Sequence, residues 1–213
     1  MTEQKNIVVV GAGGLAREIL GFLQPQIDAG QLHIVGFIDD TMLPMVSLRT
    51  ACPYPVLGTI RDYQPAAEVY LLLAIADPAA KLRIAAELEE KGAQFLSVVH
   101  PNAVLAATAK LGKGVVVHPF CFISADATLG DFVLLNCHSS VGHDVQVGAG
   151  STICAHVDLT GHVQIGRGVF VGSHASVLPS VVVGDFAKIG AGATVVRRVR
   201  EHSTVYTMPA RTL

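Results

Sequence analysis

The sequence has no excess of charge of either sign and no long basic run. Its 213 residues hold 15 Lys and Arg against 17 Asp and Glu, which gives a formal net charge of −2 at pH 7. Proteins that bind nucleic acid or anionic membranes by electrostatic attraction carry clustered positive charge. The composition therefore argues against both partners, and an anionic ligand has to be bound by a few local groups.

Long hydrophobic runs are missing as well, although 51% of the residues are hydrophobic. The opening MTEQKN has no cationic segment followed by an apolar one, and the run IVVV ends at glycines far short of a membrane span. We therefore expect a cytoplasmic protein with a substantial core, in one large or two modest domains.

Cysteine is scarce, and its spacing forms neither a C-x-x-C pair nor the disulfide pattern of a secreted protein. The four residues are Cys52, Cys121, Cys137 and Cys154. Because nothing in the neighbouring sequence would lower a thiol pKa, we interpret them as small, partly buried apolar residues and not as nucleophiles.

Residues 1–96 alternate strand and helix patterns and are expected to form one small αβ domain. Aliphatic runs predict strands within 6–13, 33–40 and 69–77, and apolar residues in helical phase predict helices over 14–27 and 78–93. This alternation is typical of a parallel sheet, and its length is enough for about one mononucleotide half of a Rossmann fold.

A glycine loop follows the first predicted strand. Gly11, Gly13 and Ala16 satisfy the spacing G-x-G-x-x-G/A of a dinucleotide-binding loop, and Asp39 and Asp40 end the next strand. Read alone, the motif favours an NAD-dependent dehydrogenase. We disfavour that interpretation because the chain has no second nucleotide-binding half and no separate substrate domain.

From residue 97 to residue 213 the pattern changes to a six-residue period. Every sixth residue from Val99 to Val195 is a branched aliphatic residue, seventeen in all with no register slip. Four residues after each, from Ala103 to Ala193, stands Ala, Val, Cys or Ser. This period predicts a second domain that is a hexapeptide β-helix, with three hexads in each triangular coil and the aliphatic side chains inside.

Many of the aliphatic residues are followed directly by glycine. There we expect either a positive φ or a close approach of neighbouring coils. The glycines are Gly130, Gly142, Gly148, Gly166, Gly172, Gly184 and Gly190.

With these features the chain resembles the hexapeptide-repeat acyltransferases. The similarity is to the sialic acid O-acetyltransferase-like subgroup, which includes the N-acetyltransferases for UDP-linked bacillosamine precursors and GDP-perosamine. The segments that carry it are VVGAGGLARE, FIDD, LLLAIAD, the hexads, SSVGHDVQVG, GSHASVLPSVVVG, IGAGATVVRRV and MPAR. The resemblance implies a left-handed β-helix and acetyl-CoA as the co-substrate.

For the αβ domain, the resemblance implies a site for the nucleotide of a sugar nucleotide, with no nicotinamide. Gly13, Gly14 and Leu15 would line the substrate, in a loop that holds phosphate through backbone N–H groups. Asp39 and Asp40 would meet the base or the ribose. The last implied substrate residue in this domain is Ala76, after the third predicted strand.

Acetyl transfer from a thioester needs a base, a partner that orients the base, and a donor for the oxyanion. His143 and Asp144 offer the first two, and the resemblance implies that His143 is the family's catalytic histidine. Since three hexads make a coil of eighteen residues, Gly161 lies one coil beyond His143, at about the 5 Å strand spacing. Its N–H would be the oxyanion donor.

The resemblance also implies ligand contacts along the β-helix. Asn136 would contact the sugar, and its alternative interpretation is a turn or ladder asparagine. Thr152, Ser173 and Ala191 would bind acetyl-CoA in a groove between subunits. The basic side chains that either meet the CoA phosphates or form a solvated edge are Lys188, Arg197 and Arg198.

Three further histidines, His138, His156 and His174, are eighteen residues apart and follow Phe120 in the same column. Because a metal site needs converging ligands and usually a carboxylate or cysteine, we predict a stacked ladder near a subunit contact and no metal. The uninterrupted prism has no loop to enclose a substrate, so we expect a homotrimer with sites between subunits.

The leading hypothesis is an acetyl-CoA-dependent N-acetyltransferase for the amino group, at C4, of a nucleotide-linked amino sugar in polysaccharide synthesis. The alternatives are a sialic acid or other sugar O-acetyltransferase, and a non-catalytic sugar-nucleotide-binding scaffold. The His143–Asp144 pair argues against the scaffold. The sequence leaves the sugar open, and also the nucleotide, whether UDP, GDP or dTDP.

Overall fold

A computed structural model describes residues 4–41 and 53–208. The chain divides into two compact units, one of residues 1–76 and 80–97 and the other of residues 77–79 and 98–213. Cys52 and residues 209–211 of the MPAR segment lie outside the described residues. Among the described residues, neither helix has the length and apolarity that crossing a bilayer requires.

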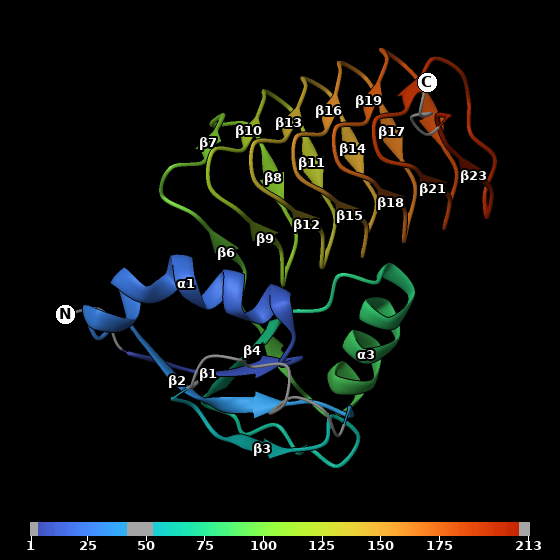
Figure 1. The fold of residues 1–213 in the computed structure, drawn as a ribbon. Coiled ribbons are helices and arrows are strands. Elements are labelled where there is room, and N and C mark those ends of the chain that lie inside the picture. The colour runs from blue at the N-terminus through green and yellow to red at the C-terminus, as the bar shows by residue number, and fades with distance from the viewer. Residues whose placement is uncertain (1–3, 42–52, 209–213) are drawn as a thin grey trace, which may run out of the picture. The chain divides into compact units, whose positions relative to one another are not determined.

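The first unit is an αβ fold around a five-stranded parallel sheet in the order β3-β2-β1-β4-β5 (Figure 1). This order confirms the expected parallel αβ domain, with its three long strands and two helices. Two edge strands, β3 and β5, escaped sequence reasoning because they have only three and two residues. The elements are β1 (Lys5–Val10), α1 (Gly14–Asp28), β2 (Leu32–Ile38), β3 (Val56–Gly58), β4 (Val69–Leu73), α3 (Pro78–Glu90) and β5 (Gln94–Phe95).

The second unit is the predicted left-handed parallel β-helix, whose coils present three flat faces (Figure 1). The six-stranded face holds β7 (Val104–Leu105), β10 (Phe122–Ile123), β13 (Ser140–Val141), β16 (Asp158–Leu159), β19 (Ser176–Val177) and β22 (Thr194–Val195). The five-stranded face holds β8 (Lys110–Leu111), β11 (Thr128–Leu129), β14 (Gln146–Val147), β17 (Gln164–Ile165) and β20 (Val182–Val183). The seven-stranded face holds β6 (Val98–Val99), β9 (Val116–Val117), β12 (Leu134–Leu135), β15 (Thr152–Ile153), β18 (Phe170–Val171), β21 (Lys188–Ile189) and β23 (Thr204–Val205).

Successive coils pair with a register of eighteen residues, as three hexads require. Val141 lies opposite Leu159, and Val147 lies opposite Ile165. The last coil departs from this register, because Lys188 pairs with Thr204. The predicted aliphatic series fills the prism: its members are buried from Val117 onward and partly buried at the open first coil.

The glycines after the aliphatic positions are required by close approach and not by a positive φ. A Cβ on Gly148 would lie 2.4 Å from the carbonyl carbon of Gly166 in the next coil. The positive φ falls instead on the turn residue two positions later, which is often not glycine: φ is 60° at Asp144 and 61° at His162. The left-handed conformation is thus concentrated at turn columns, where Asp and His tolerate it better than most residues.

The cysteines that the structure describes are all free thiols. Cys121 is buried, and burial raises its pKa to about 11. Its Sγ lies 3.2 Å from the carbonyl oxygen of Asn136. A thiol held neutral in this way is a poor nucleophile, so the interpretation of Cys121 as a packing residue holds.

One buried histidine makes folding sensitive to acid. His118 is 4% exposed, and burial, aided by the nearby charge of His100, lowers its pKa from 6.5 to about 4. The unfolded chain therefore binds a proton between pH 6.5 and 4 that the folded chain refuses, so stability falls as the pH drops through this window.

We expect the free energy of unfolding to lose about 2 kcal/mol through His118 between pH 7 and pH 5. Urea titrations of the parent and of His118→Asn at both pH values measure this loss. Other titrating groups are common to both proteins and cancel. An equal pH dependence in the two would show that His118 is not the source.

Candidate active site

The glycine loop of the first unit leads from β1 into α1. Gly11 has a φ of +95°, and a Cβ there would lie 3.0 Å from the carbonyl oxygen of Ala74. Glycine is therefore needed for both the conformation and the space. The loop lies at the carboxyl edge of the sheet, where β1 and β4 are neighbours and the strand order reverses. Open α/β sheets bind ligands at this position.

The N-terminus of α1 is open to an anion. Gly13 is its N-cap and makes no side-chain capping bond, and the first turn holds no acidic residue. Gly13 and Gly14 are exposed, and Leu15 is half-buried. The N–H groups and positive dipole end of a helix attract phosphate, so this terminus suits a nucleotide diphosphate.

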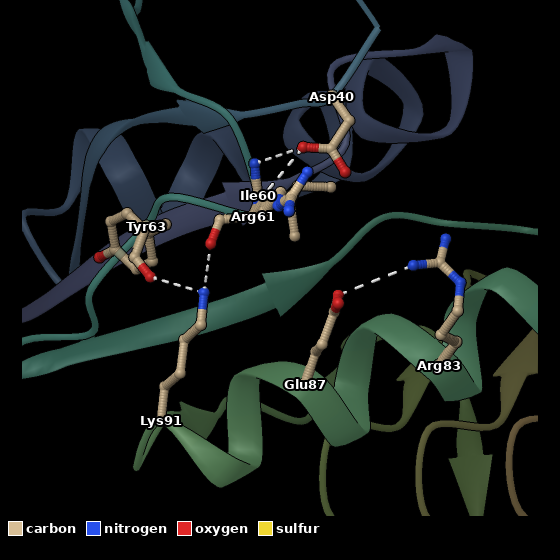
Figure 2. Close-up of polar contacts among 7 residues, drawn as sticks. All are labelled: Asp40, Ile60, Arg61, Tyr63, Arg83, Glu87 and Lys91. Atoms are coloured by element: carbon tan, nitrogen blue, oxygen red, sulfur yellow. Dashed lines mark hydrogen bonds and ion pairs between the residues drawn. The ribbon is translucent and has the colours of Figure 1, made fainter.

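The two aspartates after β2 brace the loops around this terminus. The Ala12 N–H donates to Asp39 Oδ2 at 2.7 Å, and the Thr41 N–H donates to Asp39 Oδ1 at 2.7 Å. Asp40 Oδ1 accepts from the N–H groups of Ile60 and Arg61 at 2.8 and 3.3 Å (Figure 2). The aspartates therefore have a loop-shaping role that the sequence motif did not predict.

Figure 2 shows that the same segment is held a second time by Lys91, the residue directly after α3. Lys91 Nζ donates to the carbonyl oxygens of Arg61 and Tyr63 at 2.5 and 3.2 Å. Arg83 and Glu87 form only an exposed pair at 3.7 Å on the same helix. Ala76, the remaining predicted substrate residue of this unit, is exposed three residues after β4, at the same carboxyl edge.

In the second unit, His143 and Asp144 form a paired turn between β13 and β14. His143 Nδ1 lies 2.8 Å from Asp144 Oδ2, and the side chains are 59% and 46% exposed. The Asp144 N–H donates to the Ala125 carbonyl of the preceding coil at 3.0 Å, which fixes the turn. Because a carboxylate can only accept, Nδ1 carries the ring proton and Nε2 is left as the proton acceptor.

Gly161 lies directly against the free nitrogen of this ring. A Cβ on Gly161 would be 2.5 Å from His143 Nε2 and 2.7 Å from His143 Cε1, so only glycine leaves room for the imidazole. In the described part of the chain the Gly161 N–H has no acceptor, whereas the N–H groups of Thr160 and His162 are both bonded. A bare N–H beside a base is the geometry of an oxyanion donor.

The unpaired N–H of Gly161 contrasts with the N–H groups of two other turns. At equivalent turn positions the N–H groups of Lys113 and Arg167 donate to Asp131 and Asp185 of the next coil, at 3.0 and 2.8 Å. The eighteen-residue register places Pro179 opposite Gly161, and proline has no side-chain acceptor. The Gly161 N–H is thus left open to an external oxygen.

Sequence reasoning missed a second histidine at this turn. His162 Nδ1 lies 3.8 Å from Asp144 Oδ2, and its ring meets the His143 ring edge-on with centroids 4.9 Å apart. The signal was available, because His162 stands eighteen residues after Asp144 and so stacks on it.

Asn136 is half-buried and turns its side chain back on the chain. Its Oδ1 accepts the Cys137 N–H at 2.7 Å, as a turn asparagine does, and its own N–H donates to the Ile153 carbonyl. This local bond supports the turn interpretation, while the amide group keeps its two donors for a ligand.

The three predicted acetyl-CoA residues do not share one column. Ala191 stacks one coil beyond Ser173, and these residues are exposed and half-buried respectively. Thr152 lies on β15 and is 2% exposed, and it stands 21 residues before Ser173, off the register of eighteen. A groove of about 460 Å³ follows Ala191, lined by residues 192–199 and 205–207, and includes Arg197 and Arg198.

The second histidine column is stacked as predicted. The ring centroids of His138 and His156 lie 4.9 Å apart, with an angle of 3° between the ring planes. Those of His156 and His174 lie 4.6 Å apart, with an angle of 5°. Phe120 continues the stack at 5.0 Å from His138. Parallel rings present faces and not nitrogen lone pairs to one another, so the column is poorly arranged to hold a metal.

Comparisons with known proteins agree with this architecture. The PglD N-terminal domain matches residues 6–88, and the bacterial transferase hexapeptide (six repeats) matches residues 162–197. No curated protein matches the chain significantly.

Solved structures match over nearly the whole chain. PerB from Caulobacter crescentus, in complex with CoA and GDP-perosamine, is 26% identical with a TM-score of 0.83, covering 97% of this chain and 96% of PerB. The acetyltransferase domain of PglB from Neisseria gonorrhoeae, in complex with acetyl coenzyme A, is 25% identical with a TM-score of 0.83, covering 99% and 100%. WeeI from Acinetobacter baumannii is 27% identical with a TM-score of 0.72, and the match covers 99% of this chain and 100% of WeeI.

Both units thus resemble the same group of proteins, the hexapeptide-repeat acyltransferases that carry a PglD-type N-terminal domain.

Proposed function

We propose that the protein transfers the acetyl group of acetyl-CoA to an amino group of a nucleotide-linked sugar, with His143 as the general base. The observation that carries this proposal is the arrangement at one turn. Asp144 holds Nδ1 of the imidazole at 2.8 Å, and Nε2 faces the uncapped backbone of Gly161. Base, orienting carboxylate and oxyanion donor are therefore within reach of a single reacting carbon.

In the proposed reaction the neutral sugar amine attacks the thioester carbonyl, and a C–N bond forms. His143 Nε2 takes the amine proton, and Asp144 stabilises the resulting imidazolium through its contact with Nδ1. The Gly161 N–H donates to the oxyanion. When the C–S bond breaks, the imidazolium returns the proton to the leaving thiolate of CoA. Because the amine attacks the thioester directly, no covalent acyl-enzyme is needed.

The substrate class follows from the first unit and the relatives. PerB was solved with CoA and GDP-perosamine, and the PglB domain was solved with acetyl coenzyme A. The open N-terminus of α1, at the switch point of the sheet, suits the diphosphate of such a sugar nucleotide. We assign the reacting amine to C4 of the sugar, as the family resemblance implies. A cytoplasmic location stays a prediction.

The test is a panel of UDP-, GDP- and dTDP-linked 4-amino sugars, each with its 4-hydroxy counterpart, assayed with acetyl-CoA. We expect CoA release and an N-acetylated product with an amino sugar only. Thermal shift against the same nucleotides should raise the melting temperature with one of them, since a ligand that binds the folded state stabilises it. Acetylation of the hydroxy sugars alone would contradict the proposal.

We further propose that the active form is a homotrimer. Val104 and Phe122 are 58% and 48% exposed and lie opposite each other on adjacent strands, and Phe120, in the turn before β10, is 57% exposed. Exposed apolar side chains on a flat face and its neighbouring turn suit contact with another copy of the chain.

Phe122→Glu should convert trimer to monomer in sedimentation and lower activity roughly tenfold or more, because the site is built between subunits. Thr128→Glu, on the five-stranded face, is the matched charge control. A parent chain that is a fully active monomer would contradict the trimer.

A further inference from the structure

Three metal-ligating side chains converge at the catalytic turn, and one of them has no part in the acyl transfer described above. One ligand atom from each of His143, Asp144 and His162 lies within 4.8 Å of the other two. Among residues 4–41 and 53–208, no other group of three His, Cys, Asp or Glu converges in this way. We propose that these three side chains form a binding site for a divalent cation of the zinc class, and that the bound cation inactivates the base.

The ligand separations fit such a cation. Zinc binds imidazole nitrogen and carboxylate oxygen at about 2.0–2.1 Å, which places two tetrahedral ligands about 3.3 Å apart. Asp144 Oδ2 lies 2.8 Å from His143 Nδ1 and 3.8 Å from His162 Nδ1. The first distance is shorter than the tetrahedral ligand spacing, and the second is longer. Each of these two separations is within about half an ångström of the tetrahedral spacing, and the side chains are exposed and can move to bring the two imidazoles together.

The backbone holds the ligands in place. The His162 N–H donates to the His143 carbonyl oxygen at 3.0 Å, which ties the two histidines together across adjacent coils. Asp144 and His162 stand in the same turn column of the β-helix. Both have the left-handed backbone conformation, with φ of 60° and 61°. The spacing of the three ligands is therefore a property of the coil, and ligands held by a rigid element favour binding.

The ligand types select the metal. Two imidazoles and one carboxylate suit Zn²⁺ or Co²⁺, whereas Mg²⁺ and Ca²⁺ prefer oxygen ligands alone. Three protein ligands on an exposed turn leave a fourth position for water. The His138 column lacks this convergence because its rings are stacked parallel.

The consequence for the base rests on the proposed function. A cation on Nδ1 needs that nitrogen without its proton, so the neutral ring moves its proton to Nε2. Nε2 then donates and can no longer accept the amine proton. The same cation occupies the Asp144 oxygen that would stabilise the imidazolium. Metal binding and acyl transfer therefore exclude each other at this turn.

The direct test is binding of the metal alone to the full-length protein. Co²⁺ is titrated by its visible absorption and Zn²⁺ by calorimetry, on the parent, His162→Asn and His156→Asn. Asparagine tolerates the left-handed turn at both positions, and His156 is the matched control with a φ of 59°. We expect one site per chain, a loss of affinity of roughly tenfold or more in His162→Asn, and parental affinity in His156→Asn.

Equal affinity in the parent and His162→Asn, or a loss confined to His156→Asn, would overturn the site. In the transfer assay, Zn²⁺ should inhibit the parent over its binding range, and a chelator should restore the rate. An unchanged rate at metal saturation would overturn the inactivation. If no amino sugar on the panel is acetylated while Co²⁺ binds as expected, the proposed function fails and the metal site stands.

Discussion

His143→Ala should lower kcat by on the order of 10²- to 10⁴-fold, which is the usual contribution of a positioned general base. The side chain is 59% exposed on a turn and lies outside the aliphatic series that fills the prism. Its removal should therefore leave the melting temperature and the binding of CoA and nucleotide nearly unchanged. Steady-state kinetics and thermal shift on the same preparations separate the two effects.

His156→Asn is the control for that experiment, because it changes another exposed turn histidine in a different column. It should retain the parental kcat. Asp144→Asn should cost less than His143→Ala, since the carboxylate orients the imidazole and does not carry the proton. A His143 variant within a few-fold of the parent, with activity lost on changing Asn136 or His138, would place the chemistry elsewhere.

Gly161→Ala should lower kcat by on the order of 10²- to 10³-fold, comparable to the loss of one oxyanion donor. The new methyl group would lie 2.5 Å from His143 Nε2, so the imidazole has to move away from its position over the Gly161 N–H. Gly161 does not have a positive φ, and the atoms in the way belong to an exposed, movable side chain. The fold should tolerate the change, with a loss of stability of about 1 kcal/mol or less.

Gly148→Ala gives the opposite result and is the matched control. Its methyl group would lie 2.4 Å from the Gly166 carbonyl carbon and 2.5 Å from the Gly166 carbonyl oxygen, which are backbone atoms of the next coil. Gly148→Ala should therefore lower the melting temperature, whereas Gly161→Ala should lower kcat alone. A Gly161→Ala protein that is unfolded, or fully active, would contradict the packing of His143 on this glycine.

The β-helix was predictable because its period is local and exact in the sequence. Each coil repeats one steric requirement, an aliphatic side chain inside and a small one four residues later, so counting by eighteen places His143 beside Gly161 without any structure. The same count places His162 on Asp144. This histidine follows from the same eighteen-residue spacing, applied to Asp144 instead of His143.

Other features depended on contacts with no periodic signal. Asp39 and Asp40 bind backbone N–H groups whose positions are set by segments after β2 and β3, and β3 is three residues long and carries no alternation. Thr152, Ser173 and Ala191 were assigned to acetyl-CoA by resemblance alone, and this assignment stays a prediction. The structure places Thr152 on β15, with its side chain buried.

The central claim, that His143 is the general base, is tested most directly by the pH dependence of kcat/KM with acetyl-CoA and the best amino sugar, for the parent and His143→Asn. In the parent, kcat/KM should rise with pH along a limb that belongs to the imidazole, and a limb from the sugar amine can add to it. In His143→Asn the imidazole limb should vanish and the amine limb should remain. An imidazole limb that persists in the variant would contradict the assignment.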